Sequence, residues 1–198
     1  MREKLLDAAV DCLIEFGVAG TTTLAVQRRA GVSRGALLHH FPSHATLLAT
    51  SVAELVKRNE QAVALSIADL PEPKDPLETA VSALAFAARQ PAYLAELELW
   101  AVARTDSALK QALISAERAA RREIDRVSSE LFGKWVESDA YPDVVALTQH
   151  FIRGLAISEN LRSSAPRRER LISAWTEAMR LMLRSGKESR RRNREKVR

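Results

Sequence analysis

Residues 22–41 constrain the fold more than any other stretch, because two short helical patterns flank a glycine there. Thr22 and Thr23 carry hydroxyl groups that suit the N-cap of a helix ending near Ala30. Gly31 can adopt the left-handed backbone that a helix C-cap requires, so the chain can reverse direction at this point. The pattern therefore predicts two helices joined by a tight turn.

The second helix of this pair is predicted over Arg34–His40. Ser33 is a suitable N-cap, and Pro42 ends the helix because proline cannot donate the next backbone hydrogen bond. Small residues follow Arg34 on the outer face, so this face can approach the floor of a DNA groove while the arginine reaches a guanine edge or a phosphate. We interpret the two helices as a helix-turn-helix for double-stranded DNA.

The inner face of this pair is predicted to be buried. Leu37 and Phe41 are four residues apart and therefore share one side of the helix, where we expect them to contact Val26 and Phe16. The remaining side chains suit base edges, sugars and phosphates. Those predicted to contact DNA are Thr22, Thr23, Arg28, Ser33, Arg34, Gly35, Ala36, Leu38, His39 and His44.

The segment AGVSRGALLHHFPS resembles the N-terminal DNA-binding domain of the TetR family of bacterial transcriptional regulators. Two positions depart from the family pattern: Leu38, where a tyrosine is usual, and His44, where a lysine is common. The resemblance implies a homodimeric transcription factor, most often a repressor, whose two heads read a palindromic operator. It also implies a helical body that binds a small effector, often apolar or aromatic, and dimerises through its last two helices.

The rest of the chain is predicted to be helical. Alanine, leucine, arginine and glutamate dominate, seven glycines interrupt 198 residues, and no window alternates as a strand would. We expect an all-α protein of about nine helices. A three-helix head occupies residues 1–46, and a long helix from Ser43 joins it to a helical effector-binding and dimerisation body in residues 47–184.

Residues 185–198 form a basic tail, which we expect to be disordered. It holds seven Lys and Arg against two Glu, so it accounts for the whole formal net charge of +5. The rest of the chain is neutral overall. The charge balance is therefore no evidence that the folded part binds nucleic acid, and the helix-turn-helix must carry that prediction.

The last two predicted helices, over residues 142–163 and 167–185, carry more apolar residues than one buried stripe needs. Such helices often bury one face in their own core and the other against a second subunit, although a deep monomer core is the alternative. The residues predicted at a homodimer interface are Phe151, Leu155, Leu171, Trp175, Ala178 and Met182.

Large residues of the body could line an effector pocket, although such residues are usually core. Part of the set comes from an apolar stripe after Pro91, made of Tyr93, Leu94, Leu97 and Trp100, which we expect to be buried. The predicted pocket residues are Phe86, Tyr93, Leu97, Trp100, His150 and Phe151.

The sequence holds no nucleophile paired with a base, no phosphate loop and no paired catalytic carboxylates, so we expect neither enzymatic activity nor a cofactor. His40 and His44 are four residues apart, but Pro42 separates them and no metal site is predicted. Cys12 shares a helical stripe with Leu5, which favours a packing role.

A single cysteine and the absence of a signal peptide or an apolar span lead us to expect a cytoplasmic protein without membrane insertion. Two rival functions remain open. One is a helical ligand-sequestering or partner-binding protein whose helix-turn-helix no longer reads DNA, suggested by Leu38 and His44. The other is nonspecific binding of nucleic acid or anionic membranes through the basic tail.

Overall fold

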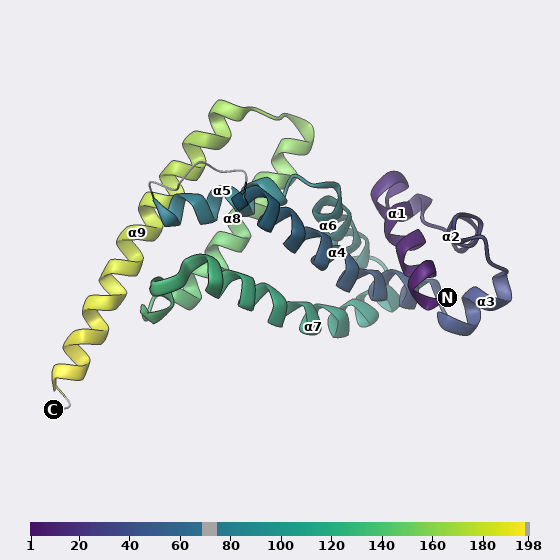
Figure 1. Cartoon of the computed structure of the whole chain (residues 1–198), viewed down its shortest axis with the longest axis horizontal. Helices are drawn as coiled ribbons and strands as arrows, with labels where there is room; N and C mark the ends of the chain where they lie inside the picture. The colour runs from purple at the N-terminus through teal and green to yellow at the C-terminus, as the bar shows by residue number, and fades with distance from the viewer. Residues whose placement is uncertain (69–74, 197–198) are drawn as a thin grey trace. The chain divides into compact units, whose positions relative to one another are not determined.

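The computed structural model describes the backbone of residues 1–68 and 75–196, with side chains up to residue 186 except those of residues 67, 119, 120 and 123. The described residues are helical without strands (Figure 1), which confirms the all-α prediction. The elements are α1 Arg2–Gly20, α2 Thr23–Ala30, α3 Arg34–His40, α4 His44–Ala68, α5 Pro76–Ala87, α6 Pro91–Ala103, α7 Ser107–Phe132, the 3-10 helix η1 Gly133–Glu137, α8 Tyr141–Leu161 and α9 Ala165–Lys196.

The chain divides into two compact units, and the division differs from the predicted boundary after residue 46. The first unit is Met1–Ala62 with Arg89–Ile124, and the second is Val63–Ala88 with Asp125–Arg198. The head therefore shares its unit with most of α4, all of α6 and part of α7. The reason is that α1 packs against α6 as well as against α2, so α1 contributes to a core with α6 in addition to the core beneath the helix-turn-helix.

One core of the first unit lies beneath the helix-turn-helix. The buried side chains of α1, α2, α3 and α4 meet there, and Leu37 and Phe41 are buried as predicted. Cys12 belongs to this core, and burial raises the pKa of its thiol. The members of this core are Leu5, Ala8, Ala9, Cys12, Val26, Ala30, Leu37, Phe41 and Leu47.

The prediction that Phe16 joins this core is wrong, because its side chain is 52% exposed. The regular part of α1 ends at Gly17, whose φ of 68° and ψ of −174° are not helical. The positions beneath Leu37 are filled from earlier turns of α1, by residues such as Leu5 and Cys12. Phe16 lies beside Gly20 instead.

A second core joins the opposite side of α1 to α4, α6 and α7. Its members from α1 are Val10, Leu13 and Val18. On α6, the buried apolar residues are alanines and Leu99, whereas the predicted stripe with Tyr93 and Leu97 is only half-buried. Apolar residues occur on more than one side of α6, so periodicity could not select the buried side, and the alanine side allows close packing against α1.

In the second unit, α5, α8 and α9 pack against one another. Thr148 of α8 accepts a hydrogen bond from Trp175 Nε1 at 3.1 Å, and the Trp175 ring stacks on Phe151. Ser138 Oγ donates to the Leu183 carbonyl at 2.8 Å. Gly186 makes this approach possible, because a Cβ there would lie 2.4 Å from Ser138 Oγ.

Two segments differ from their predicted form. In the sequence, Gly133 and Pro142 indicate a loop over residues 133–143, but this segment contains η1 and the first turn of α8. The basic segment after Ser185 was predicted to be disordered, whereas its backbone to Lys196 continues α9. Lysine, arginine and glutamate have high helix propensities, and no proline follows Gly186, so local preference allows the helix to continue despite the charge.

None of the helices in the described ranges combines the length and the apolar character needed to cross a bilayer.

Gly17→Ala should destabilise the first unit. A residue with a Cβ is strained at this φ and ψ, and the new methyl would lie 2.8 and 2.9 Å from the Glu98 carboxylate oxygens. We expect the free energy of unfolding to fall by about 1–3 kcal/mol, and further if the carboxylate must move. Urea unfolding followed by circular dichroism measures this.

The matched control is Gly35→Ala, an exposed helical position where the nearest atom to a new Cβ is 3.9 Å away. It should leave stability unchanged or raise it by up to about 1 kcal/mol. Equal stability losses for both variants would contradict the argument.

Candidate nucleic-acid interface

The two helices of the head begin and end as the residue types predict. Thr22 Oγ1 accepts a hydrogen bond from the Ala25 amide at 3.1 Å, and Ser33 Oγ accepts one from the Ala36 amide at 3.2 Å. Gly31 closes α2 in the left-handed conformation, with φ 61° and ψ 41°. The caps and the glycine together confirm the predicted helix-turn-helix.

The capping hydroxyl groups can still donate a hydrogen bond to a partner. Each oxygen of Thr22 and Ser33 accepts a bond from the backbone, and its hydrogen can still be donated. Both side chains are exposed and stand at helix N-termini, where backbone amides and the helix dipole favour an anion. This chemistry suits contact with DNA phosphates.

The outer face of α3 is exposed while its inner face is buried. Arg34, Gly35 and His39 are exposed, Leu38 is 39% exposed, and Leu37 on the inner face is fully buried. Ala36 is half-buried, so only part of its methyl group is available to a partner. The exposed face is small at its start, which permits close approach to a surface.

His44 is partly engaged within the head. Its Nε2 lies 2.5 Å from the carbonyl oxygen of Thr21. A carbonyl can only accept a hydrogen bond, so Nε2 carries the proton and donates it. The predicted phosphate contact of His44 therefore depends on Nδ1. No cluster of three or more His, Cys, Asp or Glu suited to a metal occurs among the described residues.

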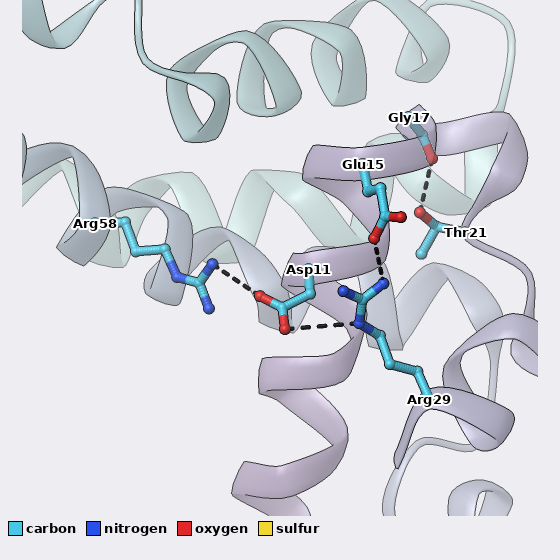
Figure 2. Close-up of polar contacts among 6 residues, drawn as sticks. All are labelled: Asp11, Glu15, Gly17, Thr21, Arg29 and Arg58. Carbon is cyan, nitrogen blue, oxygen red and sulfur yellow. Dashed lines mark hydrogen bonds and ion pairs between the residues drawn. The ribbon is translucent and has the colours of Figure 1, made fainter. Parts of the chain in front are cut away.

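Arg29 has a different role from its neighbour Arg28. Figure 2 shows its guanidinium beside two carboxylates of α1, 2.6 Å from Glu15 Oε2 and 3.7 Å from Asp11 Oδ2. The hydrogen bond to Glu15 raises the pKa of Arg29. Asp11 also binds Arg58 of α4 at 3.0 Å, so this acidic-basic cluster joins α1, α2 and α4.

Sequence reasoning missed this cluster, although a signal existed. Asp11 and Glu15 are four residues apart and share one side of α1. Which arginine they bind depends on the packing of α2 against α1, and neighbouring Arg28 is exposed. Sequence reasoning also missed Arg2, whose guanidinium lies over the Phe41 ring at 5.6 Å, and Lys4, whose Nζ approaches Gly31.

The residues predicted for an effector pocket are distributed over both units. Tyr93, Leu97 and Trp100 belong to the first unit and are half-buried. The other three residues belong to the second unit, where Phe86 and His150 are exposed.

Among the residues predicted at the homodimer interface, Leu155 is 9% exposed. The other five are half-buried. The exposed apolar side chains of α8 and α9, which the sequence reasoning missed, are Leu147, Ile157, Leu161 and Leu181.

Comparisons with known proteins agree with this geometry. The family described as "Bacterial regulatory proteins, tetR family" matches residues 5–51. An uncharacterized HTH-type transcriptional regulator of Mycobacterium tuberculosis is 29% identical over 78% of this chain and 80% of its own length. The HTH-type transcriptional regulator CymR of Pseudomonas putida is 28% identical over 89% of this chain and 88% of its own.

Two solved structures share the fold at lower identity. A transcriptional regulator from Rhodococcus sp. Rha1 superposes with a TM-score of 0.62 at 22% identity, over 93% of this chain and 96% of that one. The multidrug binding protein EbrR complexed with imidazole superposes with a TM-score of 0.63 at 18% identity, over 91% and 93%. Residues 5–51 are therefore similar to the DNA-binding head of TetR-family regulatory proteins, and the chain shares the all-helical fold of these solved structures.

Arg28→Ala and Arg29→Ala should differ in how DNA binding depends on salt. Arg28 is exposed and can replace a counterion on a phosphate, so its loss should reduce the slope of log Kd against log salt by about one. The Arg29 charge is opposed by Asp11 and Glu15, so its loss should leave this slope nearly unchanged. Fluorescence anisotropy on a labelled duplex measures both, and the opposite ranking would contradict the assignment.

Proposed function

We propose that this protein is a transcriptional repressor that binds a palindromic operator as a homodimer and is released by a small-molecule effector. The observation that carries the proposal is the capped α2–turn–α3 pair, whose inner face is buried and whose outer face presents Arg34, Leu38 and His39 to solvent. This role places the working protein in the cytoplasm, where operator DNA is found.

In this proposal α3 enters the major groove. Arg34 can pair with guanine, the Ala36 methyl can pack on thymine, and Leu38 can contact a thymine methyl or a sugar. The hydroxyls of Thr22 and Ser33 would orient the helix on the phosphates, with Thr23, Arg28, His39 and His44 as further backbone contacts. Two heads of a dimer would read half-sites about one helical turn apart or somewhat more, roughly 34–36 Å for one turn.

The test is fluorescence anisotropy on the DNA upstream of the gene and on a scrambled duplex of equal length, across a salt series. Preference for the upstream DNA near physiological salt supports the proposal, because charge alone would not distinguish the duplexes. Equal and steeply salt-dependent binding to both would favour the basic tail as the binding segment. No binding to either would favour the ligand-sequestering alternative.

Arg34→Ala should weaken operator binding by about 1–3 kcal/mol and relax the preference at one base pair, because a bidentate contact with guanine is lost. The same anisotropy assay, repeated with operators substituted at single positions, measures both effects. Arg118→Ala is the matched control, since it removes an exposed arginine of α7 outside the head. A similar loss in both variants would mean that only net charge matters.

The dimer proposal is supported by apolar side chains left exposed on α8 and α9. Leu147, Ile157 and Leu161 of α8 are 45%, 56% and 94% exposed, and Leu181 of α9 is 61% exposed. Their spacings of ten and four residues on α8 put them on one side of the helix, together with the exposed Gly154. A self-complementary face of this kind suits a two-fold dimer.

Ile157→Glu should therefore convert the dimer to a monomer, because a carboxylate would be buried without a partner at the interface. Analytical ultracentrifugation across a concentration series measures the change. Leu65→Glu is the control, since Leu65 is 66% exposed on α4, outside this face. A wild-type monomer, or equal effects of the two variants, would contradict the proposal.

Effector release is supported by the relatives and stays a proposal for this chain. EbrR, which shares the fold, is a multidrug binding protein solved with imidazole and with proflavin. We propose a small apolar or aromatic effector here, with the half-buried Tyr93, Leu97 and Trp100 of the first unit as candidate contacts. Release requires the effector to favour the non-binding conformation, typically by about 1–3 kcal/mol.

A further inference from the structure

We propose that Glu98 of α6 is a positioning residue for operator binding, acting through the peptide group between Gly17 and Val18. This inference rests on the proposed function, because its effect is on how the helix-turn-helix is held. Glu98 belongs to α6, outside the helix-turn-helix, and has no assigned part in DNA contact. Four hydrogen bonds connect it to the starts of α2 and α4.

The first bond satisfies a donor that the kink in α1 would leave without an acceptor. Gly17 turns the chain out of the helical conformation, so the Val18 amide becomes the first donor of a new turn. Glu98 Oε1 accepts it at 2.9 Å, and Val18 is only 7% exposed. A carboxylate from α6 therefore caps a turn of α1, and the bond is charge-assisted.

Glycine at position 17 is what lets the carboxylate approach. A Cβ there would lie 2.8 Å from Glu98 Oε2 and 2.9 Å from Oε1, closer than real contacts allow. Only glycine readily combines a φ of 68° with a ψ of −174°. The kink thus exposes the Val18 amide to Glu98, and the absence of a Cβ at position 17 leaves room for the carboxylate.

The same peptide group is held on its other side. The Gly17 carbonyl accepts the Thr21 hydroxyl at 2.7 Å, drawn in Figure 2, and the Thr21 amide at 3.1 Å. Thr21 is fully buried, so water cannot replace these bonds. The position of Thr21 is therefore set by the peptide that Glu98 holds.

The last of these bonds, at the Thr21 carbonyl, connects the two ends of the helix-turn-helix. The Thr21 carbonyl accepts His44 Nε2–H at the first residue of α4, just after α3, while the next residue, Thr22, caps α2. The start of α2 and the chain leaving α3 are thus tied to one residue. Loss of the Glu98 bond should loosen the placement of α3 without removing any group that touches DNA.

The experiment compares Glu98→Ala and Glu98→Gln with the wild type on operator and scrambled DNA, at a temperature where circular dichroism shows each variant folded. Glu98→Ala should bind the operator about tenfold more weakly, with little change on scrambled DNA. Glu98→Gln should recover most of this loss, because its amide oxygen can still accept from Val18. Glu169→Ala, at an exposed position of α9, controls for net charge.

A double-mutant cycle on operator affinity tests whether Glu98 acts through the Gly17 carbonyl and Thr21. Thr21→Val removes the hydroxyl that holds the Gly17 carbonyl, and its effect should not add to that of Glu98→Ala. Arg28→Ala removes an exposed candidate phosphate contact that makes none of these hydrogen bonds, and its effect should add. If the effects of Thr21→Val and Glu98→Ala on operator affinity are additive, Glu98 does not act through Thr21. Equal coupling of Glu98→Ala to Thr21→Val and to the control variant would lead to the same conclusion.

Hydrogen exchange gives a measurement that needs no DNA. The Val18 amide should exchange faster in Glu98→Ala than in the wild type and regain protection in Glu98→Gln. Unchanged protection, or full operator affinity in Glu98→Ala, would overturn the role of Glu98 while leaving the proposed function standing. A wild type without operator preference would overturn both.

Discussion

The burial of α1 on two opposite sides is the constraint on which the first unit depends. One side, with Leu5, Ala9 and Cys12, forms the core beneath α2 and α3, and the other, with Val10 and Leu13, packs against α4, α6 and α7. Burial of apolar surface stabilises both contacts of α1. Because α1 is shared, it connects the packing of α2 and α3 to that of α6.

Polar contacts fix how the helices of the first unit are placed against one another, because hydrophobic packing is not directional. The acidic-basic cluster of Asp11, Glu15, Arg29 and Arg58 fastens α1 to α2 and α4. Its members are partly exposed, so solvent and salt weaken it. The bond from Glu98 to the Val18 amide is directed at a buried backbone group, so it specifies one geometry and has no substitute in solvent.

Much of the head was predictable because its residues act locally. The caps Thr22 and Ser33, the left-handed Gly31 and the end of α3 at Phe41 each depend on neighbouring backbone, and all are found as expected. The failures concern residues whose position depends on distant elements. Phe16 is exposed because α1 kinks after it. On α6, alanines are buried rather than Tyr93 and Leu97, because the alanine side packs closely against α1.

The residue order by itself determined the all-helical class, the bounds of α2 and α3 and the exposed face of α3, since helical periodicity, capping and glycine conformation are short-range effects. Only the tertiary structure decided which arginine binds Asp11 and Glu15, and that Glu98 meets the Gly17 kink. It also decided that Leu155 is buried while Ile157 is exposed. Residues 80 positions apart in the chain make the Glu98 contact, and no local pattern specifies which distant surfaces will share a core.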